Sequence, residues 1–174
     1  QLTYQVTTSH EGEVSVDAEA LVTLVACTID EVLKQAGTRA SQIVGVATSA
    51  FWHTLVPLSA SGQPLLALMT WEDTRPQQAA TELRALLDES AIHRRTGARL
   101  HTSYWPAKIR WLSSAHPEIV QKTARYVSFA EYLSKRLLGR AICSVSMASG
   151  TGLFDLHKDC LLYTSPSPRD RQKS

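Results

Sequence analysis

Apolar and polar residues alternate along this chain with two different periods, and the period changes where turn-forming residues stand. Positions 2–6 alternate apolar and polar side chains, which is typical of a half-exposed edge strand. After Asp17, apolar residues recur at helical spacing as far as Ala36, and Gly37 follows where a left-handed C-terminal cap is expected. The pattern therefore predicts a short strand followed by a long amphipathic helix.

A strand and a hairpin are predicted next. Residues 43–47, Ile-Val-Gly-Val-Ala, form a short β-branched run bounded by turn-formers, which predicts a strand buried on both faces. Two further apolar segments, 55–58 and 65–69, flank a polar cluster that contains Gly62 and Pro64. Because Gly and Pro favour turns, these two segments are expected to pair as a hairpin. The hairpin would return the chain to the end of the first strand.

The second half of the chain repeats the change between the two periods. Strands that alternate with helices indicate an α/β layered domain. The expected segments, in order, are a helix over 76–90, a helical turn at 91–97, a loop at 101–105, a helix from Pro106, a turn from Pro117, a strand at 126–129, a helix that stops at Gly139, and a loop with a closing strand at 141–155.

Length and composition fit a globular protein. The 174 residues suit one domain or part of a larger one, and 44% of them are hydrophobic. No apolar run approaches the roughly 18 residues of a membrane span, and the first residues lack a basic segment followed by an apolar one. We therefore expect a soluble, unexported, cytoplasmic protein. The three cysteines are far apart and form no CxxC pair, which favours reduced thiols over a disulfide framework.

The charge argues against a nucleic-acid partner. The formal net charge is +2, from 18 basic and 16 acidic residues, but three of the basic residues and one acidic residue lie in 161–174. The rest of the chain is balanced and carries no basic footprint. Residues 164–174 are polar or proline throughout, and 160–174 resembles translated sequencing-adaptor read-through. We therefore expect residues 1–159 to be the folded part and 160–174 to be a non-native, disordered tail.

Candidate chemistry gathers where the hairpin ends. His53 precedes the hairpin, and Trp71, Glu72, Asp73 and Arg75 follow it, so these side chains are expected to converge on one crevice. An aromatic face, carboxylates and a guanidinium suit a polyhydroxylated ligand, which needs stacking, hydroxyl acceptors and a fork for a carboxylate. The alternative is a structural role, in which Trp71 is a half-buried strand end and Asp73 or Thr74 caps the following helix.

Six motifs follow one another along the chain: residues 45–50 with His53, 70–75, 95–97, 108–112, 128–132 and 146–152. In this order and spacing they resemble the FGGY family of carbohydrate kinases, and most of all its gluconate-kinase-type members. The resemblance covers about residues 2–159. It implies an actin-like ATPase of two domains built on ribonuclease-H-like sheets, with sugar bound in the cleft and ATP held mostly by the second domain. This chain would be an incomplete first domain.

The resemblance also suggests roles for individual residues. His53 matches the family's sugar-contacting strand end, and Trp71 and Asp73 match its Trp-x-Asp-x-Arg segment. Arg75 is expected to reach a carboxylate of the substrate, and Tyr104 lies beside a loop position where relatives present an aromatic. Lys108 and Trp111 match a signature expected to serve packing and helix placement.

The family's phosphate loop, Asp-x-Gly-Thr/Ser, and the later Gly-Asp pair that supplies its general base are absent from this sequence. We therefore expect the chain to be inactive alone. In the full-length parent the resemblance implies phosphorylation of a small-molecule sugar or sugar acid, D-gluconate to 6-phosphogluconate, with ATP and Mg²⁺. A homodimer is a candidate assembly of that parent, with neither nucleic acid nor membrane as partner.

Three alternatives remain open. The parent could be a xylulokinase-type or another pentulose- or glycerol-kinase-type member of the family. A non-catalytic α/β binding module would need none of the absent loops. A metal-dependent nuclease of ribonuclease-H type would need carboxylates at strand ends, where this sequence has apolar residues. Metal binding is not expected, because four of the six histidines, His93, His101, His116 and His157, lack ligand spacing.

Overall fold

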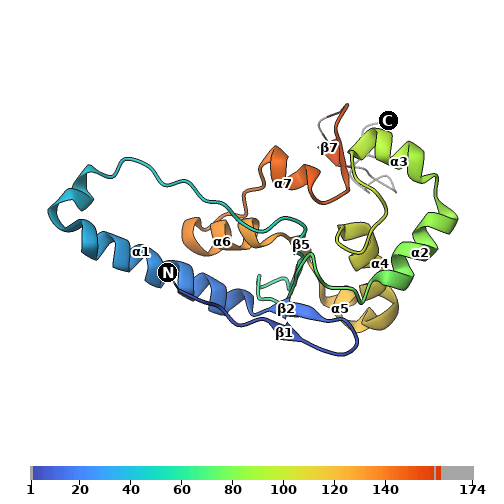
Figure 1. Cartoon of the computed structure of the whole chain (residues 1–174), viewed down its shortest axis with the longest axis horizontal. Helices are drawn as coiled ribbons and strands as arrows, with labels where there is room; N and C mark the ends of the chain where they lie inside the picture. The colour runs from blue at the N-terminus through green and yellow to red at the C-terminus, as the bar shows by residue number, and fades with distance from the viewer. Residues whose placement is uncertain (1, 159, 162–174) are drawn as a thin grey trace.

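The structure, a computed structural model, describes residues 2–158 and 160–161. Helices lie around small antiparallel sheets, and the long helix α1 extends to one side of the molecule (Figure 1). The elements in chain order are β1 (Thr7–Thr8), β2 (Val14–Val16), α1 (Ala18–Ala36), the 3₁₀ helix η1 (Gly37–Gln42), β3 (Val56–Leu58), β4 (Leu68–Met69), α2 (Gln77–Leu86), α3 (Glu89–Thr96), α4 (Trp105–Ala115), α5 (Pro117–Lys122), β5 (Arg125–Val127), α6 (Phe129–Leu138), α7 (Val145–Ser149), β6 (Phe154–Asp155) and β7 (Cys160–Leu161).

Short strand pairs bring distant parts of the chain together. The order in one sheet is β1-β2-β4, while β3 pairs with β5 and β6 with β7, all antiparallel. Leu55 and Met69 exchange backbone hydrogen bonds of 3.1 and 3.0 Å, and Leu58 bridges to Pro64. The hairpin predicted for 55–69 is therefore confirmed, and it joins the β3–β5 pair to the sheet that contains β4.

Several helix ends lie at the capping residues that the sequence indicates. Asp17 caps α1 by accepting hydrogen bonds from the backbone N–H groups of Glu19 and Ala20, and Gly37 ends it. Helix α6 starts with a capping box between Ser128 and Glu131. The predicted helices of the second half are confirmed as α2, α3, α4 and α6. The helix expected over 76–90 ends earlier, at Leu86, because Asp88 caps the separate helix α3.

The hydrophobic core has two parts. One lies between α1, the strands β2, β3 and β5, and α6, with Tyr132 fully buried at its centre. The other joins Leu55 and Met69 of the hairpin to Trp105 and Leu112 of α4. Because Leu55 and Met69 are fully buried, α4 is fixed against the two hairpin segments that lead to His53 and Trp71.

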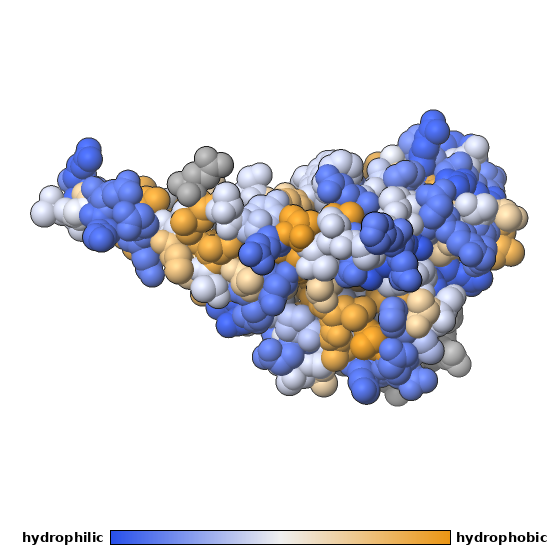
Figure 2. Space-filling view, turned by 60° about the horizontal axis from the view of Figure 1, so that its bottom comes forward, coloured by the Kyte–Doolittle hydropathy of each residue, from blue (hydrophilic) through white to orange (hydrophobic). Residues whose placement is uncertain are grey.

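The strand predicted at 43–47 is wrong. This segment is extended but belongs to no strand among the described residues, and Val44 and Val46 are exposed. A β-branched run favours extended backbone, but a strand also needs a neighbour to share its hydrogen bonds. The edge strand expected at 2–6 is also wrong, because these residues belong to no strand and the first strand is β1, Thr7–Thr8. Figure 2 shows apolar patches interrupting the hydrophilic surface of the face in view.

Two further corrections concern the C-terminal part. The segment 141–155, expected as a loop with a strand, contains the short helix α7, which Ser144 caps by accepting from the Met147 N–H group. The tail was expected to begin at residue 160, but Cys160 and Leu161 pair with β6. The rest of the expected tail, 162–174, lies outside the described residues. In the part of the chain that the structure describes, no helix has the length and apolar character needed to cross a membrane.

Candidate functional site

His53 is held in a constrained position between the extended segment and β3. Its φ of 61° is in the left-handed region, which a non-glycine residue rarely adopts. Its Nδ1 lies 2.6 Å from the carbonyl oxygen of Gly150. Because a carbonyl oxygen only accepts, Nδ1 carries the hydrogen and Nε2 is the nitrogen left to meet a ligand. The neighbouring Thr54 is fully buried and accepts a hydrogen bond of 2.9 Å from the Trp105 indole.

Tyr104 lies directly against His53, with ring centroids 4.6 Å apart. It immediately precedes α4, and the Trp105 N–H group donates to the Thr151 carbonyl at 3.0 Å. Gly152 has a φ of 76°, and a Cβ atom added to it would lie 3.2 Å from the Tyr104 Cβ. The glycine-containing segment 146–152 therefore forms one wall beside His53 and Tyr104.

Trp71 follows β4 and presents an aromatic surface. Its side chain is 55% exposed, and its backbone carbonyl accepts a hydrogen bond of 2.9 Å from Ser103 Oγ. It lines a small hollow of about 80 Å³, together with Tyr4, Phe51 and other residues of the β2 side. Trp71 can therefore stack against a ligand without first being uncovered.

Asp73 and Arg75 bond each other instead of opening onto the crevice. Asp73 is fully buried, and Arg75 Nη2 and Nε lie 2.6 and 3.0 Å from its two carboxylate oxygens. Arg75 also lies 3.4 Å from Glu13 and 4.7 Å from the ring centroid of Trp111. A carboxylate removed from water needs such a cation. The expected convergence of all five side chains on one crevice is wrong. Asp73 is buried against Arg75, and the hollow that Trp71 and Glu72 line includes neither His53 nor Tyr104. Ligand contacts of these residues stay a prediction.

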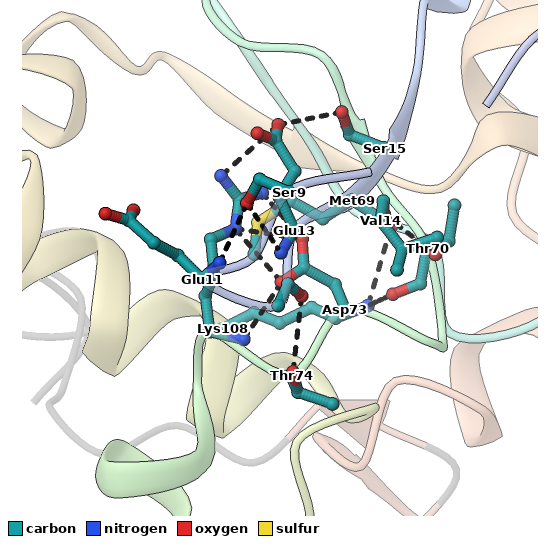
Figure 3. A network of polar contacts seen from close by, with 12 residues as sticks. Ser9, Glu11, Glu13, Val14, Ser15, Met69, Thr70, Asp73, Thr74 and Lys108 are labelled. Atoms are coloured by element: carbon teal, nitrogen blue, oxygen red, sulfur yellow. Dashed lines mark hydrogen bonds and ion pairs between the residues drawn. The ribbon is translucent and has the colours of Figure 1, made fainter. Parts of the chain in front are cut away.

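Lys108 of α4 is fully buried beneath the two segments of the site. Its Nζ donates to the carbonyl oxygens of His53 and of Thr70, the latter at 2.8 Å, and lies 3.5 Å from that of Met69. Figure 3 shows the lysine side chain running past Asp73 towards Thr70. Burial lowers the pKa of this amine to about 7, while Asp73 raises it and Arg75 lowers it.

The turn between β1 and β2 supports the Trp71 segment from the other side. Thr70 donates to the Val14 carbonyl through its backbone at 3.1 Å and its hydroxyl at 2.8 Å, and the Thr74 N–H group donates to Gly12 at 2.9 Å. Gly12 has a φ of 88°, and a Cβ there would lie 2.1 Å from Thr74 Oγ1. Figure 3 shows these contacts joining the turn to the site.

Sequence reasoning found His53, Trp71 and Tyr104 as candidate ligand contacts but missed the partners that hold them. The bond between His53 and Gly150 links residues far apart in sequence, so no local pattern reveals it. Lys108 did leave a signal, since it precedes the buried Leu112 by one helical turn and therefore stands on the apolar face of α4. It was expected to pack and place the helix, not to bond the backbone of the site.

The described residues do not fit a Mg²⁺ site. Within 2–158 and 160–161, no three His, Cys, Asp or Glu residues lie together in a way that could hold a metal ion. The buried carboxylate of Asp73 is already bound by Arg75. The site can therefore offer aromatic faces, an imidazole and hydroxyl groups to a polyhydroxylated ligand, and no step in this chain is assigned to a metal.

Comparisons with known proteins identify the family. The family model for the FGGY family of carbohydrate kinases, N-terminal domain, matches residues 1–160. The chain is similar to a gluconokinase of Bacillus licheniformis, with 28% identity over 111 residues, covering 64% of this chain and 22% of that protein. It is also similar to a probable glycerol kinase of Caenorhabditis elegans, with 32% identity over 166 residues, 86% of this chain and 32% of that protein.

Solved structures share the fold. A gluconate kinase from Lactobacillus acidophilus superposes with a TM-score of 0.83 at 22% identity, covering 89% of this chain and 31% of that chain. A xylulose kinase from Rhodospirillum rubrum gives a TM-score of 0.87 at 22% identity, covering 91% and 33%. The chain thus spans a third or less of the length of these relatives.

Proposed function

Because the chain belongs to the FGGY family of carbohydrate kinases, we propose that it supplies the sugar-binding part of an enzyme that phosphorylates D-gluconate to 6-phosphogluconate. ATP is the proposed phosphate donor and Mg²⁺ the proposed metal, both bound outside the described residues. The observation that carries the proposal is the geometry of His53, whose Nδ1 is committed to Gly150 and whose ring packs on Tyr104. An imidazole fixed in this way presents Nε2 to a ligand hydroxyl.

The proposed ligand contacts differ in what they offer. Trp71 and Tyr104 supply aromatic faces for the C–H groups of a sugar, and His53 supplies a hydrogen-bonding nitrogen. Asp73 and Arg75 are hydrogen-bonded to each other, so we propose that Asp73 holds the Arg75 guanidinium group in place. The similarity to gluconokinases of two Bacillus species, each 28% identical over 111 residues, supports gluconate as the substrate.

A neutral ketose is the second candidate substrate. Arg75 already contacts the carboxylates of Asp73 and Glu13, so a sugar acid would need to displace Glu13 to reach this guanidinium. A sugar without a carboxylate needs no such exchange. The similarity to a xylulose kinase of Streptomyces coelicolor, 31% identical over 128 residues, 71% of this chain and 26% of that protein, supports this alternative.

The test combines binding and turnover. The chain is titrated calorimetrically with D-gluconate, D-xylulose, D-ribulose and glycerol, and ATP-dependent phosphorylation of the four is measured with the kinase that carries this chain as its first domain. Turnover of gluconate above the others supports the proposal, and preference for xylulose or ribulose replaces it with the second candidate. Turnover of none of the four rejects both.

A matched pair of variants locates the sugar. Trp71→Ala removes an aromatic surface at the site, whereas Leu138→Ala removes an exposed apolar side chain at the end of α6. We expect the first to weaken sugar binding about fivefold, because stacking on an aromatic contributes about 1 kcal/mol. The second should leave affinity unchanged. Equal affinities for both variants would place the sugar elsewhere.

A further inference from the structure

We propose that Lys108 is a positioning residue that ties together the backbones of the two segments bearing His53 and Trp71, and so holds both side chains ready for the sugar. This inference rests on the proposed function for its purpose. The bonds of Lys108 on which the inference is based do not depend on that function, since they are formed within this chain. The family signature that contains Lys108 suggests packing and helix placement, without bonds to the backbone of the site.

The bonds of Lys108 join the two sides of the site at one nitrogen. Its Nζ donates to the carbonyl of His53 itself and, at 2.8 Å, to the carbonyl of Thr70, the residue directly before Trp71. The Met69 carbonyl lies 3.5 Å away, at the far limit of such a bond. An ammonium has three hydrogens to donate, so one group can satisfy all three carbonyls. A shift of either segment would break a bond to this group.

Packing alone does not explain a charge at this position. Lys108 is fully buried on the face of α4 that also carries Leu112, where an apolar side chain of similar length would fill the space without desolvating an amine. The nearby carboxylate of Asp73 is bonded by Arg75, and the hydrogen bonds of Lys108 Nζ go to backbone carbonyls instead.

His53 is the residue that most needs this support. Its left-handed backbone is unfavourable for a side chain with a Cβ atom, so it persists only where surrounding bonds hold it. Two bonds do so from opposite sides, one from Lys108 to its carbonyl and one from its own Nδ1 to Gly150. Without the first bond, the backbone can relax and the imidazole loses its fixed distance to Gly150.

The test compares two lysine variants of the chain. Lys108→Met removes the bonds to the site, whereas Lys135→Met removes a lysine of α6 that donates to Gly62 in the hairpin turn at 3.2 Å. The ring nitrogens of His53 are followed by NMR. We expect one tautomer, protonated at Nδ1, in the unchanged chain and in Lys135→Met, and a mixture of tautomers in Lys108→Met. A folded Lys108→Met that keeps the single tautomer overturns the proposal.

A measurement on the unchanged chain covers the case in which Lys108→Met does not fold. The carbonyl ¹³C shifts of His53 and Thr70 are followed while the side-chain signal of Lys108 reports its loss of a proton with rising pH. The groups that face this amine are Asp73 and Arg75, with Glu13 behind them. We expect both carbonyl shifts to change at the lysine midpoint. Carbonyl shifts that stay constant through that midpoint overturn the proposal.

Sugar kinetics in the kinase that carries this chain separate the positioning role from the proposed function. Lys108→Met should raise KM for the sugar about tenfold, a change of about 1.4 kcal/mol, with KM for ATP unchanged. Lys135→Met should change neither. An unchanged sugar KM in Lys108→Met overturns the positioning role. If the unsubstituted kinase turns over no sugar, the proposed function fails, and the His53 tautomers still decide the role of Lys108.

Discussion

The fully buried carboxylate of Asp73 is stabilised by the positive charge of Arg75. Arg75 bonds both of its oxygens. We expect Asp73→Ala to lower the free energy of unfolding by about 3 kcal/mol, because removing one partner of a buried pair strands the other. Glu82→Ala breaks an exposed pair with Arg110 and should cost about 1 kcal/mol or less. Urea denaturation measures both, and equal losses would contradict the buried pairing.

Lys108 makes the stability of the chain depend on pH in a defined direction. Burial, the largest cause, lowers the pKa of this amine from its ordinary 10.5 to about 7. Between these values the unfolded chain binds a proton that the folded chain has lost, so the free energy of unfolding rises with pH. Below pH 7 the amine is protonated in both states, and the full cost of burying its charge lowers the free energy of unfolding. Urea midpoints from pH 7 to 10 should rise more for the unchanged chain than for Lys108→Met, and parallel curves would contradict the lowered pKa.

At the scale of elements, the turn between β1 and β2 carries the next prediction. Gly12→Ala should destabilise the chain by about 2 kcal/mol or more, because its φ is positive and the new Cβ would meet Thr74 Oγ1 at 2.1 Å. Gly139→Ala is the matched control, since Gly139 also has a positive φ but nothing lies within 4 Å of the added atom. Its cost should be about 1 kcal/mol. Similar urea midpoints for the two variants would show that Gly12 of the turn is not packed closely against Thr74.

Elements whose stabilising contacts are local in sequence could be predicted, whereas elements that depend on distant contacts could not. Helix α1 is bounded by Asp17 and Gly37, whose capping bonds stay within a few residues. The run 43–47 has strong strand propensity, yet strand formation depends on a neighbour that no local pattern specifies. The hairpin at 55–69 was predictable because its turn lies between its two arms.

For the molecule as a whole, the site is assembled from segments that lie far apart in the sequence. The sequence marks His53 and Trp71 as candidate ligand contacts because family motifs carry them, and Tyr104 because it lies beside a loop position where relatives present an aromatic. Their supports, Lys108 and Gly150, act through backbone carbonyls, and a carbonyl acceptor leaves no trace in residue type. The structural alternative for Asp73 was open to sequence reasoning, since its carboxylate bonds Arg75, two residues further on, including the Arg75 N–H group at 3.1 Å.

Because three segments meet at the site, ligand binding should stabilise them together. A ligand at one hundred times its dissociation constant adds about 2.7 kcal/mol to the free energy of unfolding. With gluconate, hydrogen exchange should slow at the backbone amides of Thr70, Thr74 and Trp105, which bond across these segments. Amides near the end of α1, such as Lys34, belong to a helix that extends away from the site (Figure 1) and should exchange at an unchanged rate. Sucrose at the same concentration controls for the general effect of osmolytes. Slowing confined to the Trp71 segment would mean that the ligand contacts one wall only, and that the His53 and Gly150 wall takes no part in binding.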